Sequence, residues 1–186
     1  MKLILSLLLF FSISGYGQKH TEVYFCGKET NDLYGVLKEE GYRIRRFDAP
    51  ARLVGEAPRG AAVFIVADDY PAGKNPVERE WLEAARNKNL RLYLEYPDQF
   101  PGLSVPEKPL RARLERGVVM STAFGKDLPP TRILGINDAH ILPVKDDNPL
   151  LVLALVAGFD KAEYGIGDVP AYPLLFEKEG GLLATT

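Results

Sequence analysis

Apolar runs alternate with helical patterns along the first half of the chain. Short runs that are apolar or alternating predict strands at 22–26, 43–47, 61–67 and 90–94. Between them, Thr30 and Asn31 offer N-caps to a helix that ends at Gly41, and Asn75-Pro76 begins a helix that continues to about Asn89. Because short β-α-β crossovers return the chain to the same end of the sheet, this alternation predicts a parallel sheet with right-handed connections.

The second half of the chain reads differently, with short strand candidates separated by turn residues. We expect strands at 117–120, 133–136, 139–144 and 150–158, followed by a C-terminal β-hairpin of 172–176 with 181–184. No linker divides the chain, so the pattern predicts a single α/β domain over residues 18–186.

The first residues have the pattern of a secretory signal peptide. Met1-Lys2 precedes an apolar stretch at 3–13, and small residues follow up to Gly17. The stretch falls well short of the roughly twenty residues that a membrane span needs. We therefore expect residues 1–17 to be removed, leaving a periplasmic or secreted protein with no membrane span.

The end of the chain carries a second expectation about domain organisation. The predicted strand that ends the hairpin stops at Thr186 with no element after it to cover the sheet edge. We expect the domain to be truncated here and the natural protein to continue.

Charge and cysteine content exclude several classes of protein. The chain has 23 Lys+Arg and 25 Asp+Glu, a formal net charge of −2, which does not favour binding to nucleic acid. One cysteine excludes an internal disulfide, and two histidines with one cysteine are too few for a structural zinc site. The sequence thus predicts no metal and no cofactor.

Polar side chains gather where the predicted parallel strands end. The carboxyl ends of parallel strands form the edge at which open α/β sheets bind ligands. Carboxylates there could bind a cation or act on a sugar, or they could simply cap turns. The candidate ligand-binding residues at this edge are Asp68, Asp69, Glu95, Tyr96 and Asp98.

The order of elements resembles a known family. The features that carry the resemblance are Phe25-Cys26-Gly27, Ala67-Asp68-Asp69, the helix around Trp81, the strand 90–94 and the final hairpin with Gly-Gly-Leu-Leu-Ala-Thr-Thr. Together they resemble class I glutamine amidotransferase-like domains of the trehalose-utilisation type, as found at the N-terminus of secreted Bacteroidetes glycan-processing proteins. The resemblance implies a three-layer, flavodoxin-like, mostly parallel sheet with helices on both faces. It also implies a covalently linked C-terminal catalytic domain and a glycan as a partner.

The chemistry departs from the pattern of that family. Active members carry a nucleophilic cysteine in a Gly-x-Cys-x-Gly turn, but the equivalent stretch here is Leu94-Glu95-Tyr96-Pro97-Asp98. Cys26 ends the first strand, where we expect a buried hydrophobe, and His140 is expected to be structural. No catalytic residue is therefore assigned.

Three functions remain open. The first is a catalytically silent amidotransferase-like module of a larger secreted glycan-processing protein, with a scaffold, docking or ligand-binding role. The second is a carboxylate-dependent hydrolase that acts on a carbohydrate through residues at the strand ends. The third is a free-standing binding protein for a sugar or a peptide. The absent nucleophile favours the first.

Overall fold

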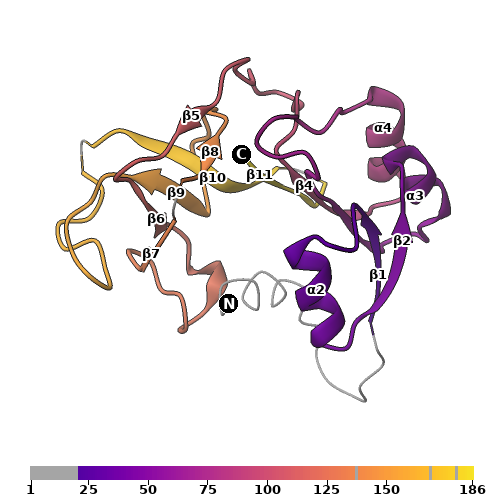
Figure 1. The fold of residues 1–186 in the computed structure, drawn as a ribbon, viewed down its shortest axis with the longest axis horizontal. Coiled ribbons are helices and arrows are strands. Elements are labelled where there is room, and N and C mark those ends of the chain that lie inside the picture. Colours follow the sequence, from indigo (N-terminus) through magenta and orange to yellow (C-terminus); the bar gives the residue numbers. More distant parts are fainter. Residues whose placement is uncertain (1–20, 137, 168, 179) are drawn as a thin grey trace. The chain divides into compact units, whose positions relative to one another are not determined.

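A computed structural model describes residues 21–186 except 137, 168 and 179 (Figure 1). The predicted signal peptide and its cleavage site lie outside these residues. The described chain forms two compact units, one of residues 21–98 and 178–184 and the other of residues 99–177 and 185–186.

The first unit alternates strands and helices, and its four predicted strands are confirmed. Its elements are β1 (Glu22–Cys26), α2 (Asp32–Glu39), β2 (Arg43–Phe47), α3 (Pro50–Glu56), β3 (Ala62–Ile65), α4 (Arg79–Asn87) and β4 (Arg91–Glu95). Parallel pairing joins β1 to β2 and to β3, and joins β3 to β4. Figure 1 shows α2 on one side of β1 and β2, with α3 and α4 on the other side.

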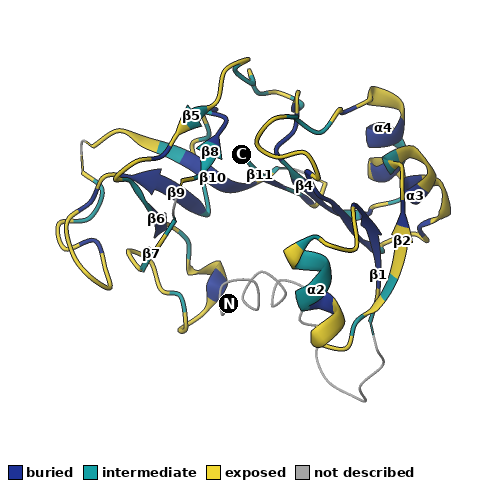
Figure 2. Cartoon of the chain, in the orientation of Figure 1, coloured by how far each residue is buried: buried dark blue, intermediate teal, exposed yellow. Residues whose placement is uncertain are grey.

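Burial follows the sequence pattern in this unit. All four residues of β3 are buried, as its unbroken apolar sequence requires, whereas β2 is largely exposed (Figure 2). The predicted cap of α2 is confirmed, because Asn31 Oδ1 accepts the Leu33 N–H at 2.9 Å.

The structure has one helix that the pattern does not predict and one that begins later than predicted. Residues 50–56 form α3, with Pro50 in its first turn, between the strands predicted at 43–47 and 61–67. The next helix, α4, begins at Arg79 rather than at Asn75. Asn75 instead forms a parallel bridge to Pro97, so tertiary hydrogen bonds replace the local helical ones there.

The second unit is antiparallel. Its strands are β5 (Leu110–Arg111), β6 (Arg116–Val119), β7 (Ile133–Leu134), β8 (His140–Ile141), β9 (Leu151–Ala154) and β10 (Ala171–Lys178), with a 3₁₀ turn, η1 (Thr122–Phe124). β6 pairs antiparallel with β7 and β9, β9 with β10, and β5 with β8. The predicted mostly parallel sheet is therefore wrong. Parallel neighbours are normally joined by a crossover helix, and the segments that connect these strands contain no α-helix among their described residues.

With β11 (Leu182–Thr185), the strand order is β2-β1-β3-β4-β11 in the first unit and β10-β9-β6-β7 in the second, while β5 and β8 form a separate pair. β10 and β11 are the strands found where the sequence predicts the C-terminal hairpin. The α/β class is confirmed at this level. Among the residues that the structure describes, no helix has the length and apolar character to cross a membrane.

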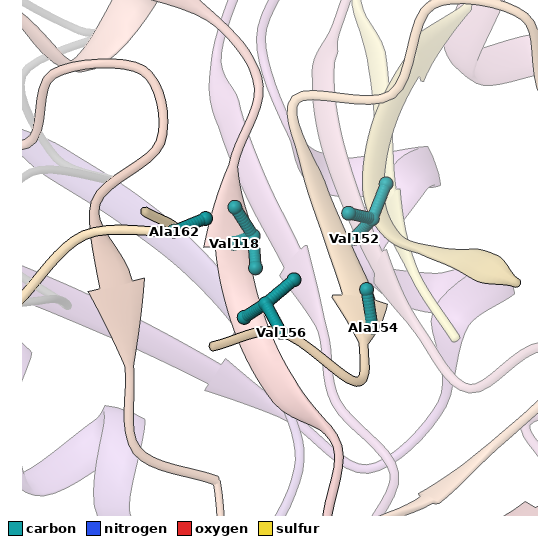
Figure 3. Close-up of a cluster of buried hydrophobic side chains, with 5 residues drawn as sticks. All are labelled: Val118, Val152, Ala154, Val156 and Ala162. Carbon is teal, nitrogen blue, oxygen red and sulfur yellow. The ribbon is translucent and has the colours of Figure 1, made fainter. Parts of the chain in front are cut away.

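A small apolar core lies within the second unit (Figure 3). Its buried members are Val118, Val152, Ala154, Val156 and Ala162. The loop that carries Ala162 is fixed by the hydrogen bond from the Ala162 N–H to Thr131 O at 2.8 Å. Contacts between β6, β9 and this loop thus hold the antiparallel strands together.

Lys88 joins the two helices α3 and α4. It follows α4, and its ammonium group donates to the carbonyls of Val54 and Gly55 at 2.7 Å and of Ala57 at 3.1 Å. These carbonyls lie at the C-terminal end of α3, where backbone acceptors lack helical partners and a positive charge is favourable.

We expect Lys88→Met to lower the free energy of unfolding by about 1–3 kcal/mol, because it leaves three carbonyls without their charged donor. Urea unfolding followed by circular dichroism measures the change. Lys126→Met, which removes an exposed lysine, is the matched control. Equal stability of the two variants would contradict this role of Lys88.

Candidate functional site

A cavity of about 370 Å³ lies at the carboxyl ends of β1 and β3. The chain leaves β1 through α2 towards β2, and it leaves β3 through α4 towards β4 on the other side. Neighbouring strands whose connections run in opposite directions form a topological switch point, and open α/β sheets bind ligands in the crevice there. The fold therefore places this cavity at the expected position for a ligand.

The cavity wall carries balanced charge. Its lining includes three cationic side chains and three carboxylates, which give no formal net charge: Lys28, Arg46, Lys74, Asp48, Asp68 and Asp69. Asn75 adds an amide, and Pro50, Val66 and Pro76 add apolar surface. The site can therefore offer donors, acceptors and apolar contacts to one ligand.

Asp68 and Asp69 lie in the cavity wall, at the edge where the sequence predicts them. Asp68 Oδ1 accepts the Lys28 N–H at 2.8 Å, and Lys28 Nζ lies 3.3 Å from Asp69 Oδ1. The loop after β1 is thus tied to the loop after β3 across the switch point.

Arg46 fixes a third part of the wall. Its Nη1 donates to the Gly27 carbonyl at 2.9 Å, and its Nη2 lies 2.7 Å from Asp48 Oδ1. A guanidinium group held by a carbonyl and a carboxylate keeps one orientation at little further cost in conformational entropy.

Gly27 lets β1 and β3 approach at the base of the site. Its φ is +156°, and a Cβ atom added there would lie 2.3 Å from Val66 Cγ2 and 2.9 Å from Phe25 Cε1. Only glycine fits this contact without a backbone shift.

Cys26 is a buried free thiol that borders the cavity, as the sequence predicts for a buried strand residue. Burial, together with the charges of Asp68 and Asp48 and against a smaller opposing effect of Arg46, raises its pKa to about 11. Since the thiolate is the nucleophile, a thiol with this pKa is almost entirely unreactive at neutral pH.

Glu95, Tyr96 and Asp98 are not among the lining residues; they form the turn that supports the wall. Glu95 Oε2 accepts the Ala67 N–H at 2.7 Å, and Asp98 Oδ1 accepts the Val77 N–H at 2.9 Å. The backbone of this turn also bonds to Asn75, through the Asn75 N–H to Tyr96 O and the Asp98 N–H to Asn75 O, both at 2.8 Å. These residues hold the segment that carries the lining.

Burial raises the pKa of the Glu95 carboxyl group. The hydrogen bond from the Ala67 N–H lowers that pKa, and the charge of Asp68 raises it. Glu95 is therefore a half-buried carboxylate with one firm partner in the loop after β3.

Tyr96 has the backbone of a sharp turn. Its φ is +48°, its side chain is buried, and its ring meets that of Tyr70 edge to face at 5.0 Å. A left-handed residue directly after a strand is the geometry that exposes a nucleophile in strand-to-helix elbows. Here the residue is a buried tyrosine, and no helix follows it before Gln99.

Sequence reasoning missed Lys28, Arg46 and Lys74. Lys28 follows the end of β1, at the same edge of the sheet at which Asp68 and Asp69 follow β3, and this placement is the signal that could have found it. His140 lies in β8, in the other unit. In the part of the chain described, no group of three or more His, Cys, Asp or Glu residues could hold a metal ion.

Comparison of the chain with protein-family models, with curated proteins and with solved structures finds no match. The resemblance to amidotransferase-like domains therefore rests on the order of elements alone.

We expect Cys26 in the native protein to react with a thiol reagent at about pH 8 at least a hundredfold more slowly than in denaturant, because a raised pKa and burial both reduce attack. Ellman's reagent measures the rate without ambiguity, since Cys26 is the only cysteine. Asp68→Asn removes a charge that raises the pKa, so it should accelerate native labelling. Equal native and denatured rates would show an accessible, reactive thiol.

We expect Glu95→Gln to gain stability relative to wild type as the pH rises above the usual carboxyl pKa of 4.5. A folded-state pKa above the unfolded value contributes stability at low pH, and this contribution is lost as the pH rises through the folded pKa. The glutamine amide can still accept the Ala67 N–H, but it has no charge to desolvate. Chemical unfolding at about pH 4 and about pH 8 measures the difference. Glu39→Gln, at an exposed site, is the control. A difference in unfolding free energy between Glu95→Gln and wild type that is the same at both pH values would contradict the prediction.

Proposed function

We propose that this chain is a non-catalytic, ligand-binding module of a larger secreted glycan-processing protein, with an amidotransferase-like arrangement. The observation that carries the proposal is the cavity at the β1–β3 switch point, which has the position of a ligand site. The thiol that borders it, Cys26, has a raised pKa and is a poor nucleophile. The larger protein and the glycan come from the resemblance, and secretion comes from the N-terminal apolar stretch.

The turn after β4 supports a module without catalysis. Amidotransferase chemistry needs a nucleophile and backbone donors for the oxyanion. Residues 94–98 contain neither cysteine nor serine, and Pro97 has no N–H to donate. Tyr96, which has the left-handed backbone of the turn, is buried.

The arrangement of α2, α3 and α4 around the parallel strands supports the finer proposal of a three-layer, flavodoxin-like unit. The order β2-β1-β3-β4 is the order of the corresponding flavodoxin-like strands. The antiparallel strands that follow would be an addition to that unit.

The alternative is a carboxylate-dependent hydrolase, and one observation favours it. The raised pKa of Glu95 is a property of general acids in glycosidases. Against it, Glu95 binds the Ala67 N–H and does not line the cavity. A hydrolase would need two carboxyl groups that face one substrate.

We expect the purified protein to release neither ammonia from glutamine nor nitrophenol from chromogenic glycosides above a buffer control. A matched preparation of Glu95→Gln should give the same background. Turnover that Glu95→Gln abolishes would replace this proposal with the carboxylate hydrolase, and turnover that Cys26→Ala abolishes would replace it with a thiol enzyme.

A further inference from the structure

The charge balance of the cavity restricts its ligand. The three cationic side chains and three carboxylates of the lining cancel. A charged ligand would be attracted by the groups of opposite charge and repelled by those of like charge. It would also lose water molecules that hydrate its charge. A neutral ligand has no such penalty.

The lining groups keep spare hydrogen-bonding capacity. The Lys28 ammonium group has three N–H donors, and its contact with Asp69 Oδ1 uses one of them. Asp68 and Asp69 each have a second carboxylate oxygen beyond the Oδ1 atoms that contact Lys28. Donors and acceptors thus lie side by side, an arrangement that suits hydroxyl groups, because each hydroxyl both donates and accepts.

The size and the apolar surface of the cavity further restrict the class of ligand that it can bind. A volume of about 370 Å³ is near the lower end for ligand pockets, which suits a single ring rather than a chain of sugars. Val66, Pro50 and Pro76 offer apolar surface for the C–H face of such a ring.

We propose that this cavity binds one neutral monosaccharide unit through its hydroxyl groups, with Asp68, Asp69 and Lys28 as the main partners. The proposal rests on the proposed function, since it names the ligand that the non-catalytic module holds.

The first experiment is isothermal titration of the purified protein with methyl glycosides of glucose, galactose, mannose, xylose and fucose, and with glucuronate and glucosamine. At least one neutral glycoside should bind with a dissociation constant on the order of 1 mM, at least about tenfold tighter than either charged sugar. The inference is overturned if no neutral glycoside binds, or if glucuronate or glucosamine binds as tightly.

Charge variants then assign the binding to this cavity. Asp69→Asn gives the lining a net positive charge and should shift the preference towards glucuronate, whereas Lys28→Met should shift it towards glucosamine. The double variant restores neutrality and should restore the preference for the neutral glycoside over both charged sugars, with a weaker affinity because the Lys28 donor is lost. Both side chains are well exposed, at 80% for Asp69 and 59% for Lys28, so the substitutions should leave folding intact.

Glu83→Gln and Arg79→Met are the matched controls. They remove the same charges from an ion pair on α4, outside the cavity lining, and should leave the sugar preference unchanged. If they shift it as much as the cavity variants do, the binding site is elsewhere and the inference fails.

The two proposals can fail separately. A neutral glycoside that binds and is recovered unchanged by chromatography supports both. Glycoside that binds here and is cleaved overturns the non-catalytic function but not the ligand class. Absence of neutral binding without turnover overturns only the ligand class.

Discussion

The hydrogen bond between Glu95 and Ala67 holds the cavity wall in place. Glu95 ends β4, and its carboxylate accepts the N–H of Ala67, the second residue after β3. Asp68 and Asp69 follow directly, and they in turn engage the loop after β1 through Lys28. A hydrogen bond to a charged acceptor is worth about 1.5–3 kcal/mol, enough to offset part of the cost of burying the carboxylate. The position of the wall thus depends on a residue that does not line it.

The fold could be predicted where local pattern and tertiary packing agree. The apolar run at β3 predicts a buried strand, and Asn31 predicts the start of a helix. Both predictions are confirmed. The start of α4 was wrong because the Asn75 backbone is bound by the turn after β4, a partner distant in sequence. The mostly parallel sheet that the family resemblance implies is wrong for the second half, because its short strands lack the helices that parallel connections require.

The site could be predicted only as an edge of the sheet. The rule that ligands bind at the carboxyl ends of parallel strands found Asp68 and Asp69, which line the cavity. It could not separate them from Glu95 and Asp98, because sequence does not show which backbone N–H groups need an acceptor. The same rule applied to cationic residues would have found Lys28. Arg46 lies within β2 and depends on a bond to the Gly27 carbonyl that no sequence pattern encodes.

The paired charges of the wall also bear on how the proposed ligand would be held. Lys28 pairs with Asp69 between the loops after β1 and β3, and Arg46 pairs with Asp48 at the end of β2. Gly27 allows the close contact with Val66 at the base of the site. A wall already ordered by its own pairs loses little further entropy when a neutral ligand enters, and preorganisation of this kind favours affinity.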